Sequence, residues 1–254
     1  MLRISALRPL ASYGLLVAAG VGLACIVTPG QAGEAVCLST PMEFADKSVT
    51  GCLDAKDADA LMDLTIRLGE NRNVNGVSLS SPTNAAQRRV VTTCREYNTA
   101  IREGWFAMST VDMTMESFFK QECGLLNAIA HARRARSSFV SSPLIGLTNL
   151  NLVSAETIGA LVPGARGSLK SLVDSGAVTV EAHGVRRLRF STKDQFAVLT
   201  EIARGDFDGD GIEDVFAVLA VHAKGGTMRD YQPLVLSRRS ASGMLEVMPF
   251  SAGG

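Results

Sequence analysis

The chain has 254 residues, which is enough for one domain or two small ones. Its 25 lysine and arginine residues are balanced by 25 aspartate and glutamate residues, so the formal net charge at pH 7 is zero. This balance excludes the basic footprint of a nucleic-acid-binding protein, and we expect no nucleic-acid partner. The cation cluster of Arg133, Arg134 and Arg136 is interpreted as the polar end of a helix, where positive charges complement the helix dipole.

Residues 1–32 have the pattern of a secretory signal peptide. Arg3 and Arg8 give a positively charged start, residues 10–27 are almost continuously apolar, and a Pro-Gly turn with small residues follows as far as Ala32. This order predicts cleavage after Ala32, export to the periplasm or the medium, and no membrane span after cleavage. A retained anchor is one alternative, since about 17–25 apolar residues can cross a bilayer. Lipid attachment at Cys25 is another.

The cysteines support export. Five are present in the whole chain, and removal of the signal peptide leaves an even set of four, namely Cys37, Cys52, Cys94 and Cys123. Such a set is typical of a disulfide framework formed in an oxidising compartment. We predict the pairs Cys37–Cys52 and Cys94–Cys123, because each pair lies within one local segment. A zinc site is the alternative, but no Cys-x-x-Cys or Cys/His spacing favours it.

Residues 33–140 are predicted to form a helical, disulfide-bonded region. Ser81 followed by Pro82 is typical of a helix N-terminus, and apolar residues then recur at steps of three and four as far as Met108. A second helix is predicted over about residues 112–136. The two helices would fold back on each other as an antiparallel hairpin, which the predicted Cys94–Cys123 disulfide would join.

The C-terminal part has the period of strands rather than of helices. Residues 141–175 are interpreted as a connector with several turn signals. Short alternating segments separated by turns then indicate an antiparallel meander over residues 176–254. The predicted fold class is α+β, with an N-terminal helical hairpin carrying disulfides and a C-terminal antiparallel β-meander.

The chemistry of the chain is concentrated in the segment Gly205-Asp206-Phe207-Asp208-Gly209-Asp210-Gly211-Ile212-Glu213-Asp214, which lies between two predicted strands. Counted from Asp206, carboxylates stand at positions one, three, five and nine, glycine at six and Ile212 at seven. Calcium suits such a set, because it takes about 6–8 oxygen ligands at about 2.3–2.6 Å, including main-chain carbonyls. Ala217 stands at position twelve, where an EF-hand needs glutamate, so an ordinary EF-hand is excluded.

The segment resembles the Asp-x-Asp-x-Asp-Gly-x-x-Asp calcium loop of FG-GAP and VCBS-type repeats, in which the loop joins two antiparallel strands. The resemblance covers about residues 196–222. It implies Asp206, Asp208, Asp210 and Asp214 as carboxylate ligands of Ca²⁺ and Ile212 as a main-chain ligand. It does not imply a propeller, because the loop occurs once and a propeller closes from several blades. An acidic hairpin turn without metal is the alternative, since Asp and Gly favour turns.

No catalytic constellation is recognised in the sequence. There is no Gly-x-Ser-x-Gly elbow, His-Glu-x-x-His motif or glycine-rich phosphate loop, and the three histidines are interpreted as capping or packing residues. Glu201 and Glu213 flank the calcium loop, within reach of the ion or of solvent. We expect an exported, non-catalytic calcium-binding protein of the cell envelope or extracellular space, with a mainly structural ion and a protein partner. The alternative is a secreted hydrolase with an unrecognised active site and a structural calcium.

Overall fold

The structure is a computed structural model that describes residues 36–67, 76–141, 144–226 and 228–249. The contacts divide the chain into a unit of Met1–Ala32 and a unit of Gly33–Gly254, and the described residues all belong to the second. The predicted signal peptide and Cys25 lie outside the described residues. None of the helices in the described ranges has both the length and the apolar character that a membrane crossing requires.

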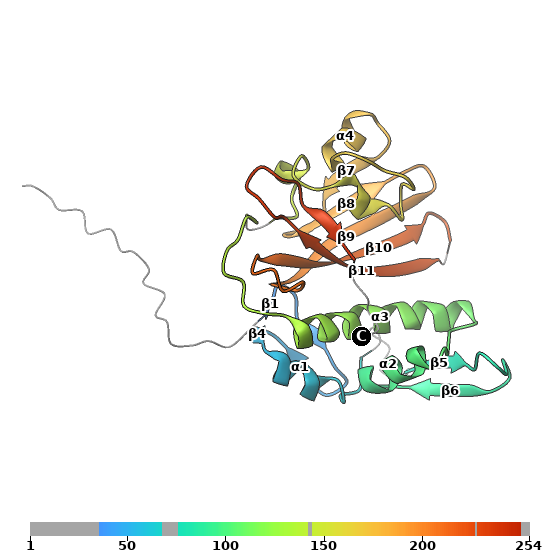
Figure 1. Cartoon of the computed structure of the whole chain (residues 1–254). Helices are drawn as coiled ribbons and strands as arrows, with labels where there is room; N and C mark the ends of the chain where they lie inside the picture. Colours follow the sequence, from blue (N-terminus) through green and yellow to red (C-terminus); the bar gives the residue numbers. More distant parts are fainter. Residues whose placement is uncertain (1–35, 68–75, 142–143, 227, 250–254) are drawn as a thin grey trace, which may run out of the picture. The chain divides into compact units, whose positions relative to one another are not determined.

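A large antiparallel sheet forms the centre of the Gly33–Gly254 unit (Figure 1). Its main path runs in the order β12-β11-β10-β9-β1-β4, while β8 pairs with β9 and β7 pairs with β8. The strands are β1 (Val36–Leu38), β4 (Cys52–Leu53), β7 (Thr179–Ala182), β8 (Arg187–Ser191), β9 (Gln195–Gly205), β10 (Asp214–Ala223), β11 (Arg229–Ser237) and β12 (Glu246–Met248). The longest, β9 and β10, pair from Asp214 opposite Gly205 to Ala223 opposite Gln195.

The sheet is buried on both faces, which explains the apolar run of its central strand. Successive side chains of a strand point to opposite faces. On β10, Phe216 and Val218 belong to one hydrophobic core, while Val215, Ala217 and Leu219 belong to another. Strand β10 therefore lies between two packed layers.

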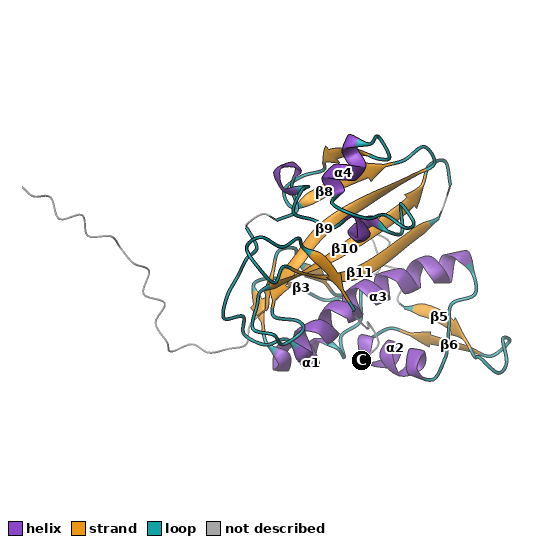
Figure 2. Ribbon diagram, turned by 45° about the horizontal axis from the view of Figure 1, so that its top comes forward, coloured by secondary structure: helices purple, strands orange, loops and turns teal. Residues whose placement is uncertain are grey.

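The long helix α3 (Thr110–His131) lies along the first face, as both ribbon views show (Figure 2). Its buried residues, Phe119, Leu125, Leu126 and Ile129, share a core with Phe216 and Val218 of the sheet. Helices α1 (Ala55–Leu61) and α2 (Cys94–Arg102) and the strand β5 (Val77–Ser80) pack against α3, and β5 forms a hairpin with β6 (Arg88–Val91). A further small hairpin joins β2 (Met42–Glu43) to β3 (Ser48–Val49).

The second core lies on the other face of the sheet. It contains Leu144, Ile158 and Leu169, which come from the segment between α3 and β7. This segment carries two 3₁₀ turns, η1 (Leu147–Asn149) and η2 (Ala155–Ile158), and the short helix α4 (Leu169–Asp174).

The predicted helical hairpin is wrong, and with it the predicted fold class. The first part of the expected helix is a turn followed by the strand β6, which pairs with β5 up to Val91, and α2 begins only at Cys94. The start of α2 is set by Thr93, whose hydroxyl accepts a hydrogen bond from the Glu96 amide while the Glu96 side chain accepts from the Thr93 amide. Ser81, expected to cap a helix, lies instead in the connection between the two strands, where its amide donates to the Gln87 carbonyl.

The division into a helical and a β-rich part also fails, because strands from the N-terminal region enter the large sheet. Strand β1 pairs with β9 and with β4, both antiparallel. The described residues hold more strand than helix and centre on one antiparallel sheet. Alternation within a segment cannot reveal this arrangement, since β1 and β9 are far apart in the sequence.

Both predicted disulfides are confirmed. Cys37–Cys52 joins β1 to β4 at directly paired residues, with a Cα–Cα distance of 3.9 Å. Cys94–Cys123 joins the first residue of α2 to the buried side of α3, with a Cα–Cα distance of 5.1 Å. Disulfides of this kind form and persist in oxidising compartments, so the two bonds indicate a location outside the cytoplasm.

Candidate metal centre

Three aspartates of the β9–β10 loop lie close enough to hold one ion. Asp206, Asp208 and Asp210 each offer a carboxylate oxygen, and these oxygens all lie within 4.8 Å of one another. Two oxygens on opposite sides of a calcium ion, at about 2.4 Å each, are about 4.8 Å apart. The spacing of the triad therefore fits a single cation.

The loop folds around its own carboxylates. The Asp206 carboxylate accepts hydrogen bonds from the amides of Gly209 at 2.7 Å and Gly211 at 2.9 Å. Oδ1 of Asp208 accepts from the Asp210 amide at 3.0 Å, and Oδ1 of Asp210 accepts from the Ile212 amide at 2.7 Å. The turns require left-handed backbone at Gly209 and Gly211, with φ of 81° and 89°, a region that glycine adopts without a Cβ clash. These bonds turn the three aspartates towards the same loop interior.

Asp214 closes the loop from the β10 side. It is fully buried, and its Oδ2 accepts a hydrogen bond from the Phe207 amide at 2.9 Å. Its Oδ1 has no hydrogen-bond partner in the described part of the chain. The pKa of Asp214 is raised to about 6, mainly by burial and also by the charges of Asp208 and Asp210, while the Ser237 hydroxyl and the Phe207 amide lower it. A cation at the triad would favour the charged form of this carboxyl.

Ile212 lies in the loop as the sequence indicated, with its main chain beside Ser137. The two hydrogen bonds of this pairing run from the Ser137 amide to the Gly211 carbonyl and from the Glu213 amide to the Ser137 carbonyl. The Ile212 carbonyl takes no part in them. The structure thus brings three of the predicted ligands together, and places Asp214 and Ile212 at the closing side of the same loop.

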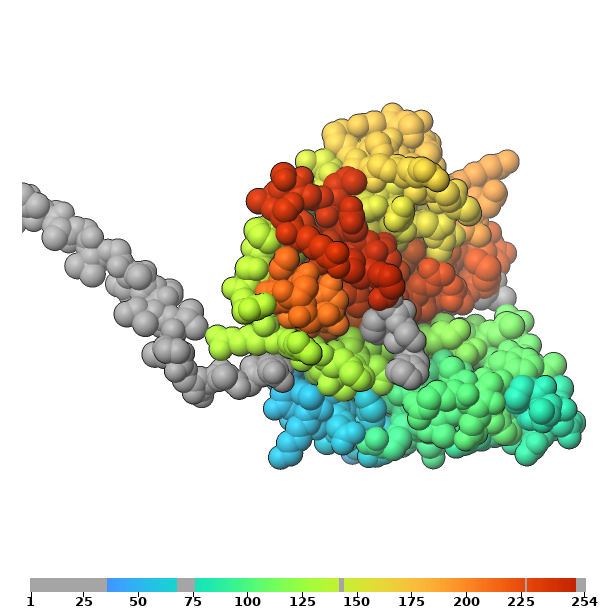
Figure 3. Space-filling model, in the orientation of Figure 1, coloured from blue at the N-terminus to red at the C-terminus, as the bar shows by residue number. Residues whose placement is uncertain are grey.

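The segment after α3 runs along the loop, which the sequence interpretation missed. Helix α3 ends at His131, so the arginines at 133, 134 and 136 follow the helix instead of forming its last turn. The Arg133 amide donates to the Asp206 carbonyl at 2.8 Å, and the Arg136 amide donates to the Gly211 carbonyl at 2.7 Å. Figure 3 shows this light-green segment against the orange loop. Main-chain bonds between distant segments leave no sequence motif.

The exposed side chain of Arg239 forms ion pairs with two aspartates of the triad. A terminal guanidinium nitrogen of Arg239 lies 3.2 Å from Oδ2 of Asp208, and its Nε lies 3.7 Å from Oδ2 of Asp210. The Arg239 side chain is 60 % exposed, and ion pairs of this kind contribute only about 0–1 kcal/mol. Arg239 therefore offsets part of the carboxylate repulsion without fixing the loop, and a metal ion at the triad would compete with it.

The two glutamates that flank the loop pair with arginines rather than with the triad. Glu201 is completely buried between Arg186 and Arg204. Glu213 accepts a hydrogen bond from the Ser138 hydroxyl at 2.8 Å and lies 3.6 Å from a terminal nitrogen of Arg204. Neither belongs to the cluster of potential ligands.

Comparison of the chain with known protein families, with curated proteins and with solved structures found no match. The resemblance to FG-GAP and VCBS-type loops therefore rests on the loop residues themselves. The aspartate triad is consistent with such a loop and with a bound metal ion.

Proposed function

We propose that this protein is an exported, non-catalytic protein that binds one calcium ion in the β9–β10 loop. The observation that carries the proposal is the aspartate triad, whose oxygens lie within 4.8 Å of one another. Carboxylates at such distances repel one another unless a cation neutralises them. Asp206, Asp208 and Asp210 would supply the first ligands, and the Ile212 carbonyl and the unpartnered Oδ1 of Asp214 would supply further ones.

Calcium fits these donors better than magnesium. The donors come from a tight turn, and they include carboxylates that also accept amide hydrogen bonds. Calcium tolerates irregular arrangements of six to eight oxygens, whereas magnesium demands a near-ideal octahedron at about 2.0–2.1 Å. Water molecules would complete the coordination.

The role of the ion is structural in this proposal. The loop connects the two longest strands of the sheet, and its main chain also holds the segment after α3. An ion among the carboxylates would stabilise these connections, because it would offset the repulsion between the carboxylates of the loop. An affinity of order 10⁻⁴–10⁻³ M, as in extracellular calcium modules, would suffice.

We assign the biological role to interaction with an envelope or extracellular protein. The assignment is supported by a group of exposed apolar side chains between α2 and the first turns of α3, namely Phe106, Met108, Val111 and Met113, which are 43–67 % exposed. These four residues are neighbours in the sequence, and exposed apolar side chains are typical of interaction surfaces where they form a contiguous patch. This part of the proposal is tested by capture of partners from the native envelope, first with calcium and then with a chelator.

The calcium site is tested by thermal unfolding of the mature protein with calcium and with a chelator. At a calcium concentration 100 times the Kd, binding stabilises the folded state by about 2.7 kcal/mol. For a domain of this size, that raises Tm by about 5–11 °C. Asp208→Ala should abolish the effect of calcium. Asp194→Ala, which removes an exposed aspartate at the opposite end of β9, should retain it. Equal Tm values in calcium and in chelator for the unaltered protein would refute the site.

A further inference from the structure

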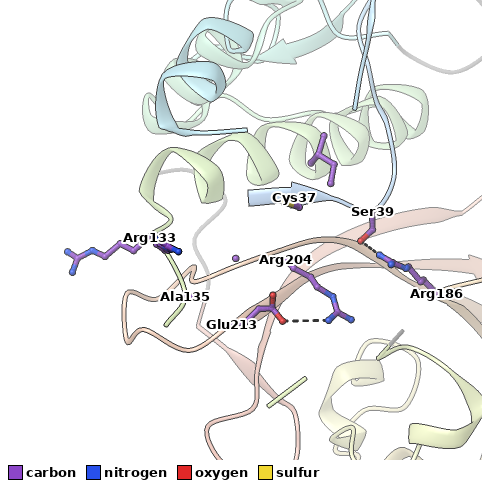
Figure 4. A pocket seen from close by; sticks show the side chains of 10 residues that line it. Cys37, Ser39, Arg133, Ala135, Arg186, Arg204 and Glu213 are labelled. Carbon is purple, nitrogen blue, oxygen red and sulfur yellow. Dashed lines mark hydrogen bonds and ion pairs between the residues drawn. The ribbon is translucent and has the colours of Figure 1, made fainter. Parts of the chain in front are cut away.

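A cavity of about 410 Å³ lies beside the calcium loop and is lined by four arginines, Arg133, Arg134, Arg186 and Arg204. They come from the segment after α3, from the turn before β8 and from the end of β9. Ser39 and Glu213 complete the polar lining (Figure 4). The chain as a whole has no net charge, so this concentration of cations is a local feature.

A buried carboxylate holds two of these arginines in place. Glu201 is 0 % exposed, and its Oε1 lies 2.8 Å from Nε of Arg204 and 3.3 Å from a terminal nitrogen of Arg186. Its Oε2 accepts a hydrogen bond from the Leu144 amide at 3.3 Å. Glu201 stands next to the irregularity in the β9–β10 register, and bulges of this kind commonly redirect a side chain near a functional site. The two guanidinium groups are thus positioned before any ligand arrives.

The cations of the cavity exceed its anions. Arg186 uses one terminal nitrogen for Glu201 and the Ser39 hydroxyl, and its other nitrogens have no partner in the described ranges. Among the described residues, the Arg134 side chain forms no hydrogen bond or ion pair, and the Arg133 guanidinium packs against Gly209 of the aspartate loop. Arg186 and Arg204 pair with Glu201 and Glu213, whereas Arg134 has no carboxylate partner among the described residues. About one positive charge of the cavity is therefore not balanced.

The backbone at Arg186 is strained. Its φ is 64°, and among the described residues it is the only non-glycine residue with a positive φ. A left-handed conformation is unfavourable for any residue with a Cβ, because the Cβ approaches the following carbonyl oxygen. Strain of this kind persists where the surroundings enforce it, and it concentrates at ligand sites. Glycine would adopt this turn without strain. The presence of arginine instead indicates that its side chain has a role at this position.

We propose that this cavity binds a small ligand through a doubly charged tetrahedral oxyanion, a phosphate or sulfate group. Arg186 and Arg204 form the fixed part of the site, and Arg133 and Arg134 form its exposed rim. Arginine suits this role because its planar fork of N–H donors matches the oxygens of such groups. The negative charge of the ligand would offset the unbalanced positive charge of the cavity. This inference does not depend on the calcium site.

The test is a calorimetric titration of inorganic sulfate into the mature protein at low ionic strength in metal-free buffer. We expect saturable binding of one sulfate. Arg134→Gln should weaken it about tenfold, the effect of losing one charge-assisted contact worth about 1.4 kcal/mol. This variant should fold normally, because Arg134 is exposed. Arg186→Gly removes a guanidinium and relieves the backbone strain, and it should weaken binding at least as much.

Arg187→Gln is the matched control, because Arg187 is the exposed neighbour of Arg186 and lies outside the cavity lining. Unchanged affinity in this variant would assign the binding to the cavity. A phosphate monoester that binds as well as free sulfate would further indicate a group carried on a larger molecule. The proposal is overturned if no saturable binding occurs below about 10 mM sulfate, or if Arg187→Gln weakens binding as much as Arg134→Gln. Sulfate binding that appears only after calcium is added would assign the anion to the metal and also overturn it.

Discussion

Arg239 and a calcium ion should compete for the same carboxylates, so Arg239→Ala is expected to raise calcium affinity. Arg239 lies 3.2 Å from a carboxylate oxygen of Asp208 and 3.7 Å from one of Asp210. Both aspartates belong to the triad that would hold the ion. A calcium ion at the triad must either displace the Arg239 guanidinium or lie close to it. Both outcomes lower the calcium affinity.

The size of the effect follows from the distances. An ion about 2.4 Å from the shared oxygen would lie about 6 Å from the guanidinium. Charges of +2 and +1 at that separation repel by about 1.4 kcal/mol in water, which is a factor of about ten in affinity. At 0.15 M salt the Debye length is about 8 Å, so the same repulsion falls to about half and the factor to about three. The expected gain is therefore about tenfold at low salt and about threefold at physiological salt.

The assay is isothermal titration of calcium into metal-free protein at the two salt concentrations. Arg166→Ala is the control, since it removes an exposed arginine that is not near the triad and changes the net charge equally. If Arg239→Ala and Arg166→Ala bound calcium with the same affinity at low salt, the ion would not lie at the carboxylates that Arg239 contacts. That result would refute the location of the site.

Three further predictions concern stability. Replacing both Cys94 and Cys123 by alanine should lower the free energy of unfolding by about 3–4 kcal/mol, because the disulfide closes a loop with a sequence separation of 29. Urea unfolding measures the loss, and an unchanged unfolding midpoint would contradict the prediction. Gly211→Ala should lower the free energy of unfolding by about 1–2 kcal/mol in the same assay, because φ is 89° at this position. Gly146→Ala is the control and should lower it less, because φ is not positive there and nothing lies within 4 Å of the added Cβ. Burial raises the pKa of Glu122 in α3 to about 7, with the Gln121 side chain lowering it and the Glu43 charge raising it. Since the pKa of Glu122 is higher in the folded than in the unfolded state, the free energy of unfolding should fall as pH rises from about 4.5 to 7 and level off above. Glu122→Gln should remove up to about 3 kcal/mol of this decline when unfolding is measured from pH 4 to 8. An unchanged profile would show that Glu122 is not the source of the decline.

The features that the sequence predicted are local in the chain. The loop that carries the aspartate triad has its residues within ten positions, and its hydrogen bonds run between residues two to seven apart. Each disulfide closes a short segment, and Cys37 and Cys52 lie opposite each other on paired strands. Local spacing determines such features, so the residue order alone indicates them.

The predicted helical hairpin failed where one pattern was compatible with two structures. Val90, Cys94, Tyr97 and Ile101 recur at helical steps, yet the chain changes from strand to helix between Val91 and Cys94. The partner strand β5 and the cap at Thr93 decide the outcome, because a strand needs a neighbour and a helix needs a start. Val90, which the helical pattern placed on the buried face, is 62 % exposed.

The arginine cavity was missed for the opposite reason, because its residues are far apart in the sequence. Arg134, Arg186 and Arg204 belong to three separate segments, and only the sheet pairing and the crossing segment after α3 bring them together. Glu201 looked like a neighbour of the aspartate loop, but the register irregularity beside it in β9 brings its side chain to the same face as Arg204, where it pairs with the arginines. Period-two patterns indicate which residues share a face, and they do not identify what covers that face.

The end of β9 contributes to both proposed sites, with a positive charge at the cavity and a negative charge at the triad. Arg204 lines the cavity, Gly205 ends the strand, and Asp206 begins the triad. The same crossing segment serves both sites, since the Arg133 amide binds the Asp206 carbonyl while the Arg133 and Arg134 side chains line the cavity. A cation in the loop would fix the main chain from which these arginines project. Calcium and an oxyanion would then favour the same arrangement of this segment, and by linkage each would raise the affinity for the other by the same factor.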